Sequence, residues 1–230
     1  MTVQEIVTRV RAAIDELIQD GADLSALTTD EQNMTRIIAD KIPYALQHVI
    51  ENAPVAKLDT SMLETLTPTE LQQRFSIDSD LVGTLKLPAD LLRIVEARLS
   101  SWSLFPIPEP STSQVYLMQQ DPYARGSYDR PVNIITHQGS DRVLEMYCAK
   151  EESDTLVFLF VRKPSIDNLI VNNVVNPDVE VDVPTLLEAA LVYQVAALTM
   201  VAYREDLASS LFAISQRYMN EDVQQPDTEE

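Results

Sequence analysis

The chain has 230 residues, of which 45% are hydrophobic, and its 17 basic and 36 acidic residues leave a formal net charge of −19. This length suggests one domain or two small ones, and the apolar fraction is high enough for a substantial buried core. The acidic surplus argues against a nucleic-acid-binding protein, which normally carries a basic face, and only 4 glycines argue against a Gly-rich phosphate-binding loop.

Helices are predicted for the N-terminal region. Apolar residues recur at helical spacing over residues 4–20, which predicts an amphipathic helix there. A second helix is predicted to begin after a cap at Thr29 or Asp30 and to end at about Ile50. Because Pro43 falls inside this second helix, we expect it to kink or split it.

A short capped helix, a strand and a further helix are predicted next. Residues 52–66 are expected to be a connection. The sequence Thr-Pro-Thr-Glu at 67–70 is typical of a helix N-terminus and predicts a helix to about Phe75. A strand is predicted over 84–87. A helix is predicted over 89–99, because its apolar residues fall on one helical face.

Short extended segments are predicted for the middle of the chain, separated by turn signals such as Gly-Ser-Asp at 139–141. They cover residues 102–107, 115–119, 132–137, 142–149 and 156–161. The last segment is continuously apolar, as expected of a strand that is covered on both faces. Residues 163–182 are expected to be irregular.

One long alanine-rich helix is predicted from Pro184 to about Met219. Proline suits the first position of a helix, and no Pro or Gly follows until Pro226. Such a helix would be roughly 50 Å long. Its many small residues favour close packing against other helices.

The element order predicts the α+β class: N-terminal helices, an antiparallel β-sheet with an inserted helix, and a long C-terminal helix. Strands and helices do not alternate as they do in a parallel α/β fold. The expected organisation is an N-terminal helical region over 1–66, an α+β core over 67–220 and an acidic tail over 221–230.

The sequence offers little catalytic chemistry. His137 and Cys148 fall on neighbouring predicted strands, so a Cys–His pair is conceivable, but the apolar alternation around Cys148 favours a small buried hydrophobe. Acidic pairs such as Glu151-Glu152 lie in a loop or the tail, where carboxylates do not converge as a metal site requires. We therefore expect no enzyme activity, no catalytic residue, no cofactor and no metal.

The most suggestive polar stretch is the loop over 120–131, which contains Tyr123, Arg125, Tyr128 and Arg130. Tyrosine and arginine frequently carry the binding energy of protein interfaces. Two interpretations stay open. Either the loop contacts a neighbouring subunit or partner, or its arginines pair within the same chain.

Membrane insertion and disulfides are not expected. Charged residues interrupt the apolar positions of residues 1–20, so we expect no secretory signal there. The longest apolar run, 189–203, is too short to span a bilayer. Cys148 is the only cysteine, which excludes a disulfide within the chain.

Three parts of the chain carry a family resemblance. They are LPADLLRIV at 87–95, YDRPV at 128–132, and the strand pair RVLEMY at 142–147 and LVFLFV at 156–161. In this order, and followed by a long predicted helix, they resemble neck (ring, or head–tail connector) proteins of tailed bacteriophages, especially those of crAss-like phages of gut bacteria. The resemblance covers roughly residues 85–220.

The resemblance implies a non-catalytic virion structural protein that is made in the host bacterial cytoplasm and placed in the phage neck. It implies a twelve-fold homo-oligomeric ring that attaches to the portal protein and to further neck or tail proteins and lines the genome channel. An acidic wall suits such a channel, because like charges repel and DNA would pass without tight binding.

Two alternatives from other classes stay open. The chain could be an acidic adaptor module that engages a basic protein partner without catalysis. It could also be an enzyme whose site is assembled across subunits, which would require a deep pocket with converging polar groups.

Overall fold

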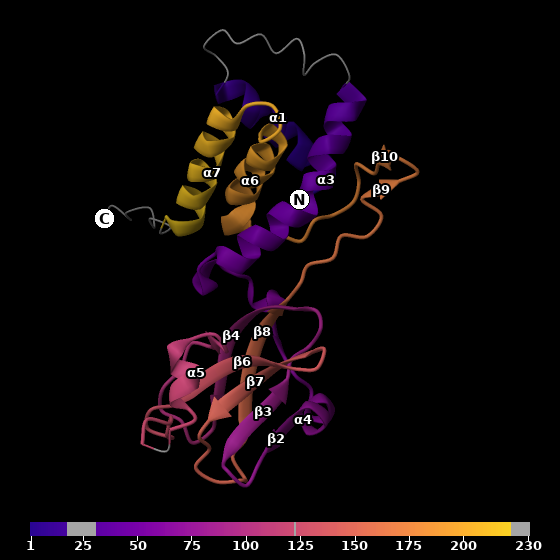
Figure 1. The fold of residues 1–230 in the computed structure, drawn as a ribbon. Helices are drawn as coiled ribbons and strands as arrows, with labels where there is room; N and C mark the ends of the chain where they lie inside the picture. Colours follow the sequence, from indigo (N-terminus) through magenta and orange to yellow (C-terminus); the bar gives the residue numbers. More distant parts are fainter. Residues whose placement is uncertain (18–30, 122, 222–230) are drawn as a thin grey trace, which may run out of the picture. The chain divides into compact units, whose positions relative to one another are not determined.

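The computed structural model describes residues 1–17, 31–121 and 123–221 of the chain. It divides the chain into two compact units (Figure 1). The helical unit joins Met1–Asp59 with Pro164–Glu230, and the β unit is Thr60–Lys163. This division differs from the expected regions 1–66 and 67–220, because tertiary contacts bring together helices from the two ends of the sequence.

The helical unit is built around one central helix. Its helices are α1 (Val3–Leu17), α3 (Glu31–Asn52), α6 (Glu188–Met200), which follows a 3-10 turn at Thr185–Leu187, and α7 (Glu205–Asn220). Figure 1 shows α6 between α7 and α3, and α6 also packs against α1. Most side chains of α6 itself are buried, on nearly every face of the helix. This is expected of a helix in the interior of a bundle.

The two predicted N-terminal helices are confirmed as α1 and α3. The predicted caps at Thr29 and Asp30 lie outside the described residues. Pro43 does not split α3, which continues from Glu31 to Asn52. Ile42 and Leu46 on either side of this proline are fully buried. Their burial, roughly 1.5–3 kcal/mol each, offsets the cost of about 3 kcal/mol for a proline inside a helix.

The prediction of a single helix over 184–219 is wrong. The chain turns at residues 201–203, and Arg204 has an extended backbone (φ −147°, ψ 93°) before α7 begins. No Pro or Gly marks this turn. The turn allows α7 to pack back on α6 and to bury Leu207 and Leu211, a tertiary gain that local helix propensity does not report.

Residues 163–182, which were expected to be irregular, contain a small β-hairpin. Its strands are β9 (Ile170–Val171) and β10 (Val174–Val175), which pair in antiparallel fashion. Asn172 and Asn173 between them both have positive φ, 51° and 64°, the conformation that a two-residue type I′ turn requires.

In the part of the chain that the structure describes, the β unit holds a five-stranded sheet in the order β2-β3-β7-β6-β5 and a three-stranded sheet in the order β1-β8-β4. The first contains β2 (Phe75–Ile77), β3 (Val82–Lys86), β7 (Asp141–Tyr147), β6 (Val132–Gln138) and β5 (Glu109–Pro110). The second contains β1 (Leu63–Thr65), β8 (Leu156–Arg162) and β4 (Leu91–Leu99). Pairing is antiparallel except between β5 and β6.

Short helical segments connect these strands: η1 (Val55–Lys57) and η2 (Thr60–Met62), then α4 (Pro68–Arg74) and α5 (Gln114–Met118). The predicted cap of α4 is confirmed, because the Thr67 side chain accepts from the Glu70 N–H and the Glu70 carboxylate accepts from the Thr67 N–H. The predicted turn at 139–141 is confirmed as well, and Gly139 has a φ of 66°, which glycine adopts without strain.

Two predicted elements of the β unit are of the wrong type. The segment over 89–99 forms the strand β4 and not a helix, because pairing with β8 from Leu91 opposite Arg162 to Leu99 opposite Leu156 supplies the backbone hydrogen bonds. The segment over 115–119 forms the helix α5 and not a strand, and the Ser113 side chain caps its N-terminus.

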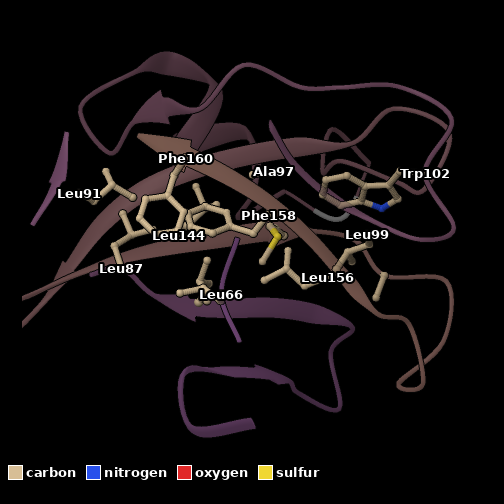
Figure 2. Packing of buried hydrophobic residues seen from close by; sticks show 13 residues of the cluster. Leu66, Leu87, Leu91, Ala97, Leu99, Trp102, Leu144, Leu156, Phe158 and Phe160 are labelled. Atoms are coloured by element: carbon tan, nitrogen blue, oxygen red, sulfur yellow. The ribbon is translucent and has the colours of Figure 1, made fainter. Parts of the chain in front are cut away.

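The hydrophobic core of the β unit takes side chains from both sheets (Figure 2). Leu85 and Leu144 come from the five-stranded sheet, and Phe158 and Phe160 of β8 stack with ring centroids 5.2 Å apart. Trp102 closes one end of the cluster and donates from Nε1 to the Cys148 carbonyl at 2.9 Å. Helices and mixed sheets together confirm the α+β class.

Candidate functional site

The described residues of the predicted interaction loop, 120–121 and 123–131, form turns between the end of α5 and the start of β6. Asp121 organises its first half, because its backbone carbonyl accepts from the Arg125 N–H at 2.9 Å and its side chain accepts from the Tyr123 N–H at 2.9 Å. In the second half the Gln119 side chain accepts from the buried Gly126 N–H at 2.8 Å. These hydrogen bonds hold the described residues of the loop in place within the β unit.

Gly126 anchors this loop against the neighbouring strands. A Cβ at this position would lie 3.1 Å from the Tyr147 carbonyl oxygen and 3.1 Å from a Val132 methyl carbon, so a side chain there would require these neighbours to shift by a few tenths of an ångström. The Cys148 thiol donates to the Gly126 carbonyl at 3.1 Å. The base of the loop is thus held close to the end of β7.

The Arg125 side chain makes its contacts within the β unit. Its Nη2 donates to the Asp80 carbonyl at 3.0 Å, and its guanidinium carbon lies 5.4 Å from the centroid of the Tyr147 ring. Burial raises the pKa of Tyr147, and the hydrogen bond from its hydroxyl to the Glu145 carboxylate raises the pKa further. Of the two open interpretations, pairing within the chain therefore describes Arg125.

The other three residues of the predicted site point to solvent. Tyr123 is 100% exposed, and Tyr128 is partly exposed with the Lys150 ammonium 5.9 Å from its ring centroid. The Arg130 backbone closes a turn with the Ser127 carbonyl at 2.9 Å, while its side chain is on the exposed surface. These three side chains are available to a partner.

Exposed apolar residues in the same unit were missed by sequence reasoning. Leu104, Phe105 and Ile107 are exposed, Ile107 by 82%, and so are Leu117 and Met118 of α5. Large apolar side chains grouped on a surface mark binding sites more often than chance. The signal in the sequence was the apolar content of 102–107, which we interpreted as a strand rather than as an exposed segment.

The segment over 104–107 is held in place although its side chains face outward. The Arg98 guanidinium of β4 lies 5.2 Å from the centroid of the Phe105 ring. The buried Asn133 of β6 donates from Nδ2 to the Pro106 carbonyl at 3.2 Å and to the Ala97 carbonyl at 2.7 Å. Because these contacts hold the segment, a partner that covers its side chains would cost side-chain conformational entropy but little backbone entropy.

The conceivable Cys–His pair is not formed. His137 lies opposite Arg142 at one end of the β6–β7 pair, whereas Cys148 follows Tyr147, which lies opposite Val132 at the other end. Five strand residues separate the two ends, roughly 16 Å. Burial raises the pKa of the Cys148 thiol, which disfavours the reactive thiolate.

Within residues 1–17, 31–121 and 123–221, no group of His, Cys, Asp or Glu side chains could hold a metal ion. A cleft of about 670 Å³ lies between α1, α3 and β10 of the helical unit. Its arginines contact protein groups, since Arg11 donates to the Thr35 hydroxyl at 2.7 Å and Arg36 donates to the Asn33 side chain at 3.1 Å.

None of the helices built from the described residues has the length and apolarity needed to cross a lipid bilayer. Comparison of the chain with models of known protein families and with curated proteins finds no match. The function is therefore argued from the residues and their geometry.

Proposed function

We propose that this chain is a virion structural protein, a ring-forming neck (head–tail connector) subunit that attaches to the portal and lines the genome channel. The observation that carries the proposal is the exposure of large apolar side chains in the β unit, namely Leu104, Phe105 and Ile107 together with Leu117, Met118 and Tyr123. In the proposal, these exposed apolar side chains make the contact between copies of the chain.

The finer part of the proposal, a phage neck, is supported by the resemblance of segments 87–95, 128–132, 142–147 and 156–161. The net charge of −19 supports it as well, because an acidic channel wall repels DNA and leaves it free to move. The same charge favours the second candidate, an acidic adaptor that binds a basic partner. The two candidates differ in whether the chain associates with itself.

The exposed apolar surface predicts an effect of Ile107→Asp on self-association. A charge in the middle of an apolar contact is expected to weaken association about tenfold or more, the loss of roughly 1.4 kcal/mol or more that follows removal of one interface hot spot. Mass photometry or sedimentation of the full chain over a concentration series measures this change. An image of the associated species tests whether it is a ring.

The matched control is Gln138→Asp, which adds the same charge at the exposed end of β6 and should leave association unchanged. A wild-type chain that stays monomeric at all concentrations would contradict the ring proposal and favour the adaptor. Equal weakening by both variants would show that net charge, and not the apolar surface, governs association.

The loop over 120–131 predicts different effects for its two arginines. Arg130→Ala should weaken association while the thermal midpoint of the monomer stays within about one degree, because its side chain is exposed. Arg125→Ala should instead destabilise the monomer by roughly 1–3 kcal/mol, because it removes the contacts with Asp80 and Tyr147. Thermal unfolding and sedimentation separate the two. A destabilised Arg130→Ala monomer would mean that Arg130 is also an internal brace.

A further inference from the structure

The turn between α6 and α7 lacks the residues that normally end a helix. Residues 201–204 are Val-Ala-Tyr-Arg, without Gly or Pro. Val201 keeps a helical backbone (φ −49°, ψ −40°), and its N–H donates to Ala197 O at 3.1 Å. The Arg204 N–H still donates to Met200 O at 2.8 Å, the spacing of an α-helix. The Tyr203 N–H also donates to Met200 O, at 2.9 Å, so α6 ends in a tightened turn over residues 201–203 before the extended backbone of Arg204.

The start of α7 is only weakly held in its present form. Arg204, its N-cap residue, provides no side-chain cap. The Arg204 guanidinium instead pairs with Asp206 at 3.0 and 2.8 Å, and this pairing lowers the pKa of Asp206 to about 2. Both groups are exposed to solvent, and exposed ion pairs contribute little to stability. Straightening the turn would therefore lose little from this ion pair, and in a continuous helix the first N–H groups of α7 would bond to carbonyls one turn earlier in the chain.

α7 is held to the helical unit mainly by α6 (Figure 1). Ser215 donates to the Ala190 carbonyl at 2.9 Å, and the rings of Tyr193 and Tyr218 stack with centroids 5.5 Å apart. The buried Lys57 ammonium donates to the Tyr218 carbonyl at 3.0 Å. These contacts are made when an α7 helix occupies this position. The α7 helix of another copy of the chain carries the same side chains and carbonyls and can make them equally well.

We propose that α7 exchanges between copies of this chain. In the exchanged form, α6 and α7 are one continuous helix, and α7 of each copy packs on α6 of the next. Such an exchange is head-to-tail, so it forms a closed ring when the rotation between copies closes. This inference rests on the proposed ring assembly, because it names a contact through which the copies associate.

Concentration decides between the two forms. The contacts of α7 are the same in both, but packing within one chain has an effective concentration in the millimolar range. Exchange is therefore expected where copies are crowded together, as in an assembly, and the dilute protein is expected to keep the α6–α7 hairpin.

Glu205→Pro tests whether the helix must straighten. In the hairpin, residue 205 is the first residue of α7 and follows the extended Arg204, a place where proline is well tolerated. In a continuous helix the same proline would remove a hydrogen bond and clash with the preceding turn. We expect Glu205→Pro to leave the thermal midpoint of the dilute monomer nearly unchanged and to weaken association at least tenfold. The control Glu205→Ala removes the same carboxylate without introducing a proline, and it should associate as the wild type does.

A cross-linking experiment with two different chains detects the exchange directly. One chain carries Ala190→Cys and the other carries Ser215→Cys, and both carry Cys148→Ser so that no other thiol is present. The hydrogen bond of 2.9 Å from the Ser215 hydroxyl to the Ala190 carbonyl shows that these two positions meet where α7 packs on α6. After the chains are mixed, concentrated and oxidised, exchange gives a disulfide between the two different chains. A single chain with all three substitutions shows that the pair can form.

The outcomes separate this inference from the proposed function. Cross-chain disulfides in a ring support both. Rings without cross-chain disulfides, or Glu205→Pro rings as stable as the wild type, overturn the exchange and leave the ring proposal standing. Cross-chain disulfides in a species that is a dimer and never a ring support the exchange and overturn the ring. A wild type that stays monomeric when concentrated overturns both.

Discussion

Replacing Trp102 by alanine is expected to lower the free energy of unfolding of the protein by about 3–5 kcal/mol, the range observed for large aromatic residues in cores. Trp102 is the only tryptophan, is 3% exposed, and closes one end of the core of the β unit (Figure 2). Alanine would leave a cavity there. It would also leave the Cys148 carbonyl without the indole N–H that it accepts at 2.9 Å.

Two further variants separate packing from hydrogen bonding at this position. Trp102→Phe keeps most of the apolar volume but removes the donor, so roughly 1–3 kcal/mol of the loss should remain. Leu104→Ala, two residues away on the exposed surface, should change stability by about 0.5 kcal/mol or less. Chemical denaturation followed by circular dichroism is the suitable measurement, because the fluorescent reporter is itself replaced. A loss below 1 kcal/mol for Trp102→Ala would contradict the described core.

Leu211→Ala is expected to lower the free energy of unfolding by about 2–5 kcal/mol. Leu211 lies in the middle of α7, is fully buried, and belongs to the face that packs on α6. Alanine has the higher helix propensity, so any loss of stability must come from packing and not from the helix itself. With a total stability of about 5–15 kcal/mol for a typical domain, such a loss is a large fraction of the whole.

The control for this variant is Gln216→Ala on the exposed face of the same helix. It should be neutral within about 0.5 kcal/mol. Denaturation of both variants under dilute conditions gives the comparison. If Leu211→Ala were as neutral as the control, α7 would not be packed on α6 in the monomer, and the hairpin described for the helical unit would be incorrect.

Local patterns were sufficient where the chemistry of an element is local. The apolar spacing of residues 4–20 predicted α1, and the Thr67–Glu70 pair predicted the capped start of α4. The turn at Gly139 followed from a residue type that tolerates positive φ. The polar loop over 120–131 was also recognised from its residue types.

The parts of the site that depend on neighbours could not be read from the sequence. Arg125 and Arg130 are five residues apart in one loop, yet only the folded β unit places Asp80 and Tyr147 beside Arg125. The outward direction of Ile107 likewise depends on Asn133 of β6, which holds the adjacent Pro106 carbonyl. A sequence shows which side chains are apolar, but the fold determines which of them remain exposed.

The sequence by itself determined the α+β class, the positions of most helices and of the strands β3, β6, β7 and β8, and the acidic net charge, because these depend on composition and on short-range periodicity. Only the tertiary structure decided three features: the strand β4 in place of a helix, the turn between α6 and α7, and the union of the two chain ends in one helical unit. Each depends on partners distant in the sequence. For β4 the partner is β8, and for α7 it is the buried face of α6, and burial against such partners outweighs local helix propensities of less than about 1 kcal/mol per residue.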